Sequence, residues 1–304
     1  FEDNAEFGFG MHLGVEAIRE RITTKIEEAL SLELSPKERE AMQTWLDNKD
    51  KGENSRVIAD RLIAVLEESD LEIAKEILKD KYFLVKRSQW IFGGDGWAYD
   101  IGFGGLDHIL ASGENVNVLV FDTEIYSNTG GQSSKATPQA SVAKFATTGK
   151  TTKKKDLGLM AMTYGNVYVA QISMGANMNQ TIKAIVEAEN YNGPSLIIAY
   201  ATCIAHGIKL GMGSTPYEEK IAVDSGYWTL YRYNPALKEE GKNPFILDSK
   251  QPHMNIRNFL MGEVRYSSLA KTNPEAAEEM FAEVEKEAKD RYNRYKTLSE
   301  NIIF

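Results

Sequence analysis

The sequence predicts an α/β protein built on a doubly wound, mostly parallel sheet, with a helical segment before it and a helical arm after it. Between residues 86 and about 205, short branched or aromatic runs alternate with helical patterns, which is typical of a parallel sheet with helices on both faces. The preceding residues are helical in pattern, and so is a charged stretch near the end of the chain. We therefore expect a helical segment at 1–85, an α/β domain at 86–240 and a C-terminal extension with a long helix at 241–304.

The N-terminal segment shows a helix start and a continuous apolar stripe. Ser35, Pro36 and Glu38 form the pattern of a capping box, with proline at the first helical position. A charged and polar run at 48–54 predicts a loop. After it, apolar residues recur at helical spacing and predict one buried face: Leu62, Ile63, Val65, Leu66, Leu71, Ile73, Ile77 and Leu78.

The central region contains four strand patterns and four helix patterns. The strands are expected at 89–92, 117–121, 167–172 and 195–200. The helices are expected at 101–111, 138–146, 156–162 and 179–190, with Thr137 and Pro138 as N-cap and first residue of the second. A further helix at 274–298 has a narrow apolar face and is interpreted as a packing arm; the face consists of Met280, Phe281, Val284 and Ala288.

Composition and charge exclude several classes of partner. Hydrophobic residues make up 42% of the 304 residues, so the chain can bury a sizeable core. The net charge of −9 gives no overall electrostatic basis for binding nucleic acid, and no apolar run approaches the roughly 20 residues of a membrane helix. A single cysteine excludes an internal disulfide framework and indicates a reducing, cytoplasmic compartment. Without an initiator Met or a signal-peptide pattern, the sequence is expected to be part of a longer chain.

Glycine and short polar residues follow every predicted strand. In an open parallel sheet, ligands bind outside the carboxyl ends of the strands. Backbone N–H groups free of side chains suit a phosphate, and oxygen side chains suit a hard cation. The sequence therefore predicts a phosphate and metal site at this edge, formed by the segments 93–97, 122–131, 173–175 and 201–203.

Asp95 and Thr123 are the strongest candidates for metal ligands. Gly94-Asp95-Gly96 is not a dinucleotide fingerprint, because Tyr99 stands where that pattern needs glycine or alanine, and the chain has no P-loop motif. Alone, this short motif is weak evidence for a site, because it is more often an ordinary turn. Thr123 follows one helix and one strand later, so two consecutive strand ends bring the carboxylate and the hydroxyl together. One carboxylate, one hydroxyl, a backbone carbonyl and two diphosphate oxygens would suit Mg²⁺.

Two longer strings resemble one enzyme family. They are residues 93–102, beginning with Gly-Gly-Asp-Gly-Trp-Ala-Tyr-Asp, and residues 122–132, Asp-Thr-Glu-Ile-Tyr-Ser-Asn-Thr-Gly-Gly-Gln. Together with residues 1–8 and 199–203, they are similar to pyruvate:ferredoxin (flavodoxin) oxidoreductases, and the similarity continues through the C-terminal helix. The resemblance implies the thiamine-diphosphate-binding fold, in the C-terminal portion of such an enzyme.

The resemblance also implies roles for individual residues. Mg²⁺ would be held by Asp95, Thr123 and the backbone carbonyl of Ile125. Cys203 would be the last thiolate ligand of a 4Fe-4S cluster whose other three cysteines lie upstream, and Asn128 would act in catalysis beside the reacting carbon. The thiamine diphosphate would be lined by Gly94, Asp95, Gly96, Trp97, Thr123, Glu124, Ile125, Tyr126, Ser127 and Asn128. Judged without the resemblance, Asn128 is an ordinary turn residue and Cys203 a small buried apolar residue.

The implied reaction is the oxidative decarboxylation of pyruvate with coenzyme A to acetyl-CoA and CO₂. Electrons would pass through iron–sulfur clusters to ferredoxin or flavodoxin, and a homodimer is expected. In that family the activating glutamate and the substrate-binding arginine lie in another domain. Three alternatives remain open: an oxidoreductase for another 2-oxo acid, an iron-free thiamine-dependent lyase or transferase, and a non-enzymatic assembly module.

The remaining charged residues receive ordinary interpretations. Lys150, Lys153, Lys154 and Lys155 form a small basic run that we expect to be solvated, with contact to coenzyme A phosphates or to an acidic ferredoxin as the alternative. The four histidines are scattered without metal-binding spacing.

Overall fold

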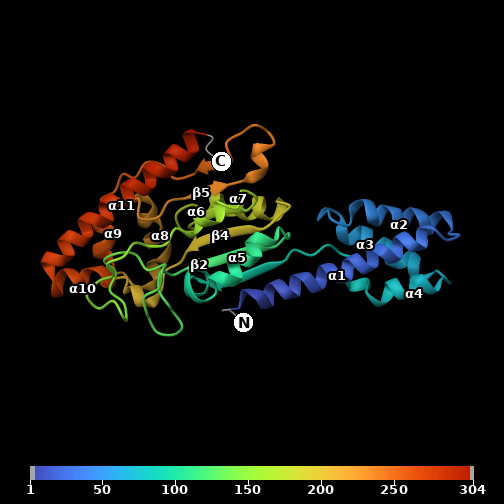
Figure 1. Cartoon of the computed structure of the whole chain (residues 1–304), viewed down its shortest axis with the longest axis horizontal. Helices are drawn as coiled ribbons and strands as arrows, with labels where there is room; N and C mark the ends of the chain where they lie inside the picture. Colours follow the sequence, from blue (N-terminus) through green and yellow to red (C-terminus); the bar gives the residue numbers. More distant parts are fainter. Residues whose placement is uncertain (1–3, 302–304) are drawn as a thin grey trace. The chain divides into compact units, whose positions relative to one another are not determined.

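A computed structural model describes residues 4–301 of the chain (Figure 1). The described residues form two compact units, one of residues 8–89 and one of residues 90–301 together with residues 4–7. Each unit is described by itself below. None of the helices within residues 4–301 is long and apolar enough to cross a membrane.

The first unit is helical, as the sequence predicts. Its elements are α1 (Ala5–Leu30, whose first residues belong to the other unit), α2 (Pro36–Asn48), α3 (Ser55–Glu67), α4 (Glu72–Lys79) and the short η1 (Lys81–Phe83). The capping box at Ser35 is confirmed, because the Ser35 side chain accepts from the Glu38 N–H and the Glu38 side chain accepts from the Ser35 N–H. The predicted stripe is also confirmed: Leu62, Val65, Leu66 and Ile77 are buried in one cluster around Trp45, and the other four pack against it.

The second unit is built on a six-stranded sheet in the order β1-β2-β4-β3-β5-β6. The first four strands in this order are parallel, and β5 and β6 join at one edge as antiparallel strands. This confirms the mostly parallel α/β sheet and adds two three-residue strands that are too short to give a periodic signal. The strands are β1 (Trp90–Gly94), β2 (Asn117–Asp122), β3 (Tyr168–Ile172), β4 (Ser195–Tyr200), β5 (Tyr231–Tyr233) and β6 (Phe245–Leu247).

Helices cover both faces of this sheet. Ile197 of β4 packs in one cluster with Ala184 and Ala188 of α7 (Met178–Asn190). Its neighbour Ile198 faces Gly158 of α6 (Leu157–Met162) on the opposite side. The other helices are α5 (Phe103–Ser112), α8 (Thr215–Asp224), α9 (Ile256–Gly262), α10 (Val264–Thr272) and α11 (Pro274–Glu300), with short helical turns η2 (Trp97–Ile101), η3 (Ile204–His206), η4 (Met212–Ser214) and η5 (Pro235–Lys238).

The C-terminal residues belong to the same compact unit as the sheet. The predicted extension at 241–304 contributes β6, which pairs with β5, and α11, whose Tyr295 packs against Tyr231. The expected apolar face of this helix is confirmed for Phe281, Val284 and Ala288, which are buried, whereas Met280 is only half-buried. The helix is thus a packing arm, as its sequence predicts.

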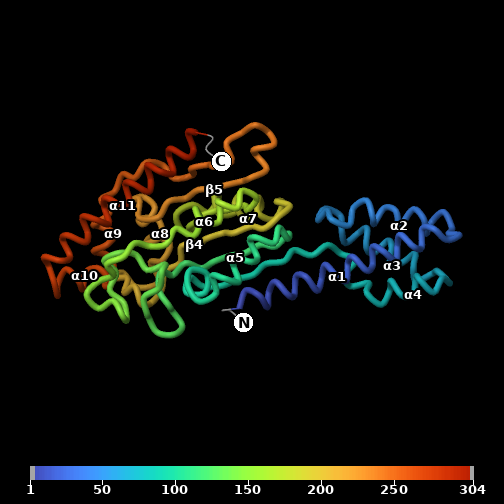
Figure 2. The backbone as a smooth tube through the Cα atoms, in the orientation of Figure 1, coloured from blue at the N-terminus to red at the C-terminus, as the bar shows by residue number. Residues whose placement is uncertain are grey.

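The helix predicted at 138–146 is wrong. Residues 123–156 form a long irregular segment between β2 and α6, which the trace in Figure 2 follows. Ala140 has a φ of 68°, which a helix excludes, and the N–H groups of Ala140 and Val142 bond to the carbonyls of Lys150 and Arg265. Thr137 is therefore no N-cap: its hydroxyl donates to the Glu124 carbonyl at 2.6 Å. Tertiary backbone pairing replaces the local helical pattern here.

Arg232 of β5 provides a stability prediction for this unit. Its buried guanidinium pairs with Asp248 at 2.8 Å and with Glu187 at 2.5 Å. Arg232→Met would leave two carboxylates unpaired, and we expect it to reduce the free energy of unfolding by about 3 kcal/mol. Within the full-length protein, the melting temperature of the unit that contains Arg232 should fall by roughly 6–12 °C. Arg257→Met removes a more exposed arginine that also has two carboxylate partners, and an equal fall for both variants would contradict the prediction.

Candidate functional site

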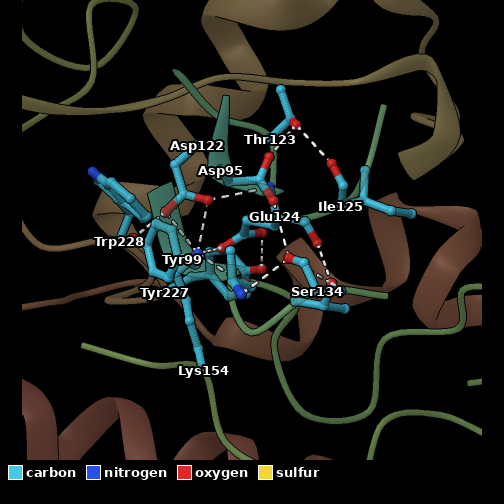
Figure 3. Close-up of polar contacts among 12 residues, drawn as sticks. Asp95, Tyr99, Asp122, Thr123, Glu124, Ile125, Ser134, Lys154, Tyr227 and Trp228 are labelled. Carbon is cyan, nitrogen blue, oxygen red and sulfur yellow. Dashed lines mark hydrogen bonds and ion pairs between the residues drawn. The ribbon is translucent and has the colours of Figure 1, made fainter. Parts of the chain in front are cut away.

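Two neighbouring strand ends bring Asp95 and Thr123 together. Gly94, the last residue of β1, is in register with Phe121 of β2, so the residues that follow each strand meet at the same edge. The Thr123 hydroxyl donates to Asp95 Oδ1 at 2.7 Å (Figure 3). The same hydroxyl oxygen lies 3.1 Å from the Ile125 carbonyl oxygen and 2.8 Å from the Ser127 hydroxyl. The structure thus brings the three predicted metal ligands into one cluster.

The chemistry of this cluster suits a hard cation. A carboxylate oxygen, a carbonyl oxygen and two hydroxyl oxygens converge. The two hydroxyl groups supply only two hydrogens for hydrogen bonds among these four oxygens, so lone pairs are left that a cation could accept. Within residues 4–301, no group of three or more His, Cys, Asp or Glu side chains is placed to hold a metal ion. A cation here would therefore use one carboxylate with neutral oxygens and would need further ligands from a bound phosphate, as Mg²⁺ commonly does.

Asp95 is buried in a polar pocket at this edge. Its second oxygen accepts from the Ser134 hydroxyl at 3.0 Å. Burial, followed by the nearby charge of Asp122, raises the pKa of the Asp95 carboxyl above its ordinary range. The positive charges among the described residues therefore do not fully compensate the ionised Asp95 carboxylate. A divalent cation bound beside Asp95 would stabilise this ionised form.

The glycines around Asp95 differ in why they are needed. A Cβ at Gly96 would lie 2.2 Å from the Tyr126 ring, and a Cβ at Gly93 would lie 2.2 Å from the Trp97 ring. Close packing therefore requires glycine at both positions. A Cβ at Gly94 would meet no protein atom within 4 Å, so its backbone is open toward the outside, where a phosphate could approach it.

The other predicted cofactor residues are placed in different ways. Ser127 and Asn128 are exposed at the end of the loop, and Tyr126 is half-buried. The side chains of Trp97 and Ile125 are buried within the protein, so that mainly their backbone faces the loop. Cys203 lies in one apolar cluster with Ile125 and Ala143, and its sulfur accepts from the Ala205 N–H at 3.4 Å. The lone cysteine is thus packed against the metal-ligand loop.

The Glu124 side chain turns away from the open edge into a buried ion network. The carboxylate is 1% exposed and pairs with Arg265 at 2.8 Å and with Lys154 at 3.4 Å (Figure 3). Burial alone would raise the pKa of Glu124, but Lys154 and Arg265 outweigh it and lower the pKa. Glu124, which the resemblance places among the cofactor-lining residues, therefore does not present its side chain to the open edge of the sheet.

The prediction of a solvated lysine run is wrong for three of its four members. Lys154 is 14% exposed and pairs with Asp122 at 2.7 Å, and Lys150 donates to the carbonyls of Ser134 and Thr137. Lys155 donates to the Tyr99 carbonyl at 3.2 Å. Only Lys153 is largely exposed among the four, at 69%. The error arises because the groups that accept from these lysines, two carboxylates for Lys154 and backbone carbonyls for Lys150 and Lys155, lie 13 to 56 residues away in the sequence.

Several residues around the site carry no sequence signal. Arg265, Tyr227 and Ser134 contact Glu124 or Asp95 from separate elements. His206 is fully buried, and its Nε2 lies 2.6 Å from the Thr123 carbonyl oxygen. The sequence around His206 shows no metal-binding spacing. Its contact with the loop could not be predicted, because the two residues are 83 positions apart in the sequence.

Glu218 of α8 provides a pH prediction near this network. Burial, and then the charge of Glu263, raises the pKa of Glu218 to about 7. Between pH 4.5 and 7, Glu218 is therefore protonated in the folded state and mostly ionised in the unfolded state. Because the folded state binds more protons in this range, the free energy of unfolding should fall as the pH rises from about 4.5 through 7. Glu218→Gln should be more stable than the parent above pH 7, by at most about 3 kcal/mol. Melting temperatures of both proteins at pH 5 and pH 8 test this, and an equal difference at both values would contradict it.

Comparisons with known proteins agree with this geometry. Residues 81–199 match the family described as thiamine pyrophosphate enzyme, C-terminal TPP binding domain. The chain is 56% identical over 301 residues to a pyruvate-flavodoxin oxidoreductase from Klebsiella pneumoniae, covering 98% of this chain and 26% of that protein. It is 57% identical over 309 residues to a pyruvate:ferredoxin oxidoreductase from Moorella thermoacetica, covering 99% and 26%.

A solved 2-oxoglutarate:ferredoxin oxidoreductase from Magnetococcus marinus matches with a TM-score of 0.35 and 27% identity, over 37% of this chain and 38% of that chain. The fold assignment here rests on the sheet topology and on the domain match rather than on this likeness. The chain spans about a quarter of the length of the two curated relatives. It is therefore homologous, over nearly its whole length, to a part of the pyruvate-flavodoxin and pyruvate:ferredoxin oxidoreductases, and its residues 81–199 match the C-terminal TPP binding domain of thiamine pyrophosphate enzymes.

Proposed function

We propose that this chain supplies the thiamine diphosphate and magnesium site of a pyruvate:ferredoxin or flavodoxin oxidoreductase. The full-length enzyme would convert pyruvate and coenzyme A to acetyl-CoA and CO₂ in the cytoplasm. The observation that carries the proposal is the convergence of Asp95, Thr123 and the Ile125 carbonyl at one edge of the sheet. The similarity to proteins with these names over 98–99% of the chain supports the choice of pyruvate as substrate.

The residues of this site would bind and orient the cofactor. Asp95, Thr123 and the Ile125 carbonyl would hold Mg²⁺, and the open backbone at Gly94 would receive the diphosphate. When bound, thiamine diphosphate supplies an electron sink for decarboxylation of a 2-oxo acid. The exposed amide of Asn128 would hydrogen-bond the substrate near the reacting carbon.

Cys203 would contribute one thiolate to a 4Fe-4S cluster, which requires three cysteines from elsewhere in the full-length protein. Cys203 packs in one cluster with Ile125, and a sulfur beside the proposed magnesium ligands would suit one-electron transfer from the thiamine site. Ferredoxin or flavodoxin would accept the electrons, and the full-length enzyme would be a homodimer. A second candidate is a thiamine enzyme without iron, which the burial of Cys203 in an apolar cluster equally permits.

An anaerobic assay on the full-length protein tests the proposal. Reduction of a low-potential dye is followed with pyruvate, with and without coenzyme A, after thiamine diphosphate and iron have been quantified. We expect reduction that requires both substrates. A protein that contains both cofactors but is inactive with pyruvate and active with another 2-oxo acid would correct the substrate, and a protein without iron would favour the second candidate.

A further inference from the structure

The turn that carries the candidate metal ligands has a strained backbone. Glu124, which separates Thr123 from Ile125, has a φ of 59°, a left-handed conformation that residues other than glycine seldom adopt. Such a conformation is unfavourable for a residue with a side chain, and it persists only where its surroundings impose it. In this conformation the Ile125 carbonyl oxygen lies 3.1 Å from the Thr123 hydroxyl, so both oxygens are available to one cation.

The Glu124 side chain is held from several directions. Its carboxylate pairs with Arg265 Nη2 at 2.8 Å and with Lys154 Nζ at 3.4 Å, and it accepts from the Tyr227 hydroxyl. Its backbone N–H donates to Asp122 Oδ1 at 3.1 Å. Each of these partners is buried or nearly so, and Figure 3 shows Lys154 and Tyr227 gathered beside the turn. The contacts therefore fix the one residue whose conformation sets the geometry of the turn.

The two cations are themselves anchored. Lys154 pairs with Asp122 at 2.7 Å and donates to the Ala136 carbonyl at 2.8 Å. Arg265 is fully buried, and its Nε pairs with Glu263 at 2.6 Å. Arg265 comes from α10, 141 residues after Glu124, so the C-terminal part of the chain reaches the turn through this side chain.

Stability alone gives little reason for this network. Replacing a buried ion pair with apolar groups is often neutral or stabilising, because the desolvation of the charges offsets their attraction. A buried arginine does fix the orientation of a carboxylate. Its guanidinium group is planar, and each N–H must point at the oxygen that accepts from it. The network is therefore better suited to holding the turn in one shape than to raising the stability of the unit.

We propose that Arg265 and Lys154 are positioning residues, whose ion pairs with Glu124 hold the turn 123–125 in the shape that presents Thr123 and Ile125 to magnesium. The inference rests on the function proposed above and adds residues outside the family motif to that site. It predicts a change in magnesium binding opposite to the change that charge alone would cause. Removing the Arg265 charge leaves the surroundings of the cation more negative, which would by itself tighten magnesium binding, whereas loss of the turn geometry should weaken it.

The test measures magnesium-dependent retention of thiamine diphosphate by the full-length protein in equilibrium dialysis. In Arg265→Met, the Mg²⁺ concentration for half-maximal retention should rise roughly tenfold or more. Arg265→Lys keeps the charge but loses the fork, and it should lie between the parent and Arg265→Met. Arg257→Met, which removes a distant arginine with two carboxylate partners, should stay within about twofold of the parent.

Three outcomes would overturn the inference. A lower melting temperature in Arg265→Met with an unshifted or lower Mg²⁺ requirement would show that the network has only a structural role. Should that variant fail to fold, Tyr227→Phe removes a donor to the same carboxylate without changing its charge, and an unshifted Mg²⁺ requirement there would equally reject the inference. If the parent protein itself shows no magnesium-dependent retention, the proposed function fails, and the inference fails with it.

Discussion

Replacing Asp95 with asparagine is expected to abolish magnesium-dependent retention of thiamine diphosphate by the full-length protein. Asp95 is the only carboxylate in contact with the Thr123 hydroxyl among the described residues, and a neutral amide offers a hard cation much less attraction. The loss of affinity should exceed the roughly 10- to 100-fold that is typical of residues that only support a ligand. Pyruvate-dependent dye reduction should be lost in parallel.

The control for this prediction is Asp107→Asn. Asp107 lies on α5 and accepts from the Tyr164 hydroxyl, so the same substitution changes one charge outside the site. Because Asp95 is buried and its pKa is raised, Asp95→Asn should fold at least as well as the parent when magnesium is absent. Retention of the cofactor at the parent's Mg²⁺ concentration would show that Asp95 is not a metal ligand.

Replacing Cys203 with serine is expected to remove one iron–sulfur cluster from the full-length protein. Serine keeps the size of the side chain but offers iron no thiolate. Iron and acid-labile sulfide should each fall by about four atoms per chain, and coenzyme A-dependent dye reduction should fall by at least roughly 100-fold. Magnesium-dependent retention of thiamine diphosphate should be unchanged, because the Cys203 side chain packs against the apolar side chain of Ile125 and not against the candidate oxygen ligands.

The matched control introduces the same hydroxyl without touching the sulfur. Ala143 lies in the same buried cluster as Cys203, so Ala143→Ser reports the effect of a polar group in this packing. If Cys203→Ser leaves the iron content unchanged and resembles Ala143→Ser in its melting temperature, Cys203 is a core residue and the iron-free alternative is favoured.

The sheet edge was predictable because it depends on local patterns. Each parallel strand has a branched apolar run bounded by glycine or polar residues, and the strand predicted at 195–200 matches β4 without a shift. Carboxyl ends of parallel strands lie along one edge whatever the strand order. Asp95 and Thr123 could therefore be placed on the same edge of the sheet from the sequence, and their contact follows from the direct pairing of β1 with β2.

The segment 123–156 shows where local reasoning fails. The residues from Pro138 to Ala146 have a helical pattern, but backbone N–H groups of this stretch pair with the carbonyls of Gly131, Lys150 and Arg265. Such pairings do not recur at a regular spacing along the chain, so no pattern in the sequence predicts them. The same holds for Lys154, whose flanking lysines suggest a solvated run although its partners are the buried carboxylates of Asp122 and Glu124.

The sequence by itself determined the α/β class, the helical segments at both ends, and the candidate oxygen ligands that follow β1 and β2. These features follow from periodicity and from the common edge of parallel strands, which are properties of neighbouring residues. Only the tertiary structure decided that Glu124 turns inward in a left-handed conformation to meet Arg265. The physical reason is that a buried charge must find its partner wherever the fold brings one, and that partner can lie at any distance along the chain.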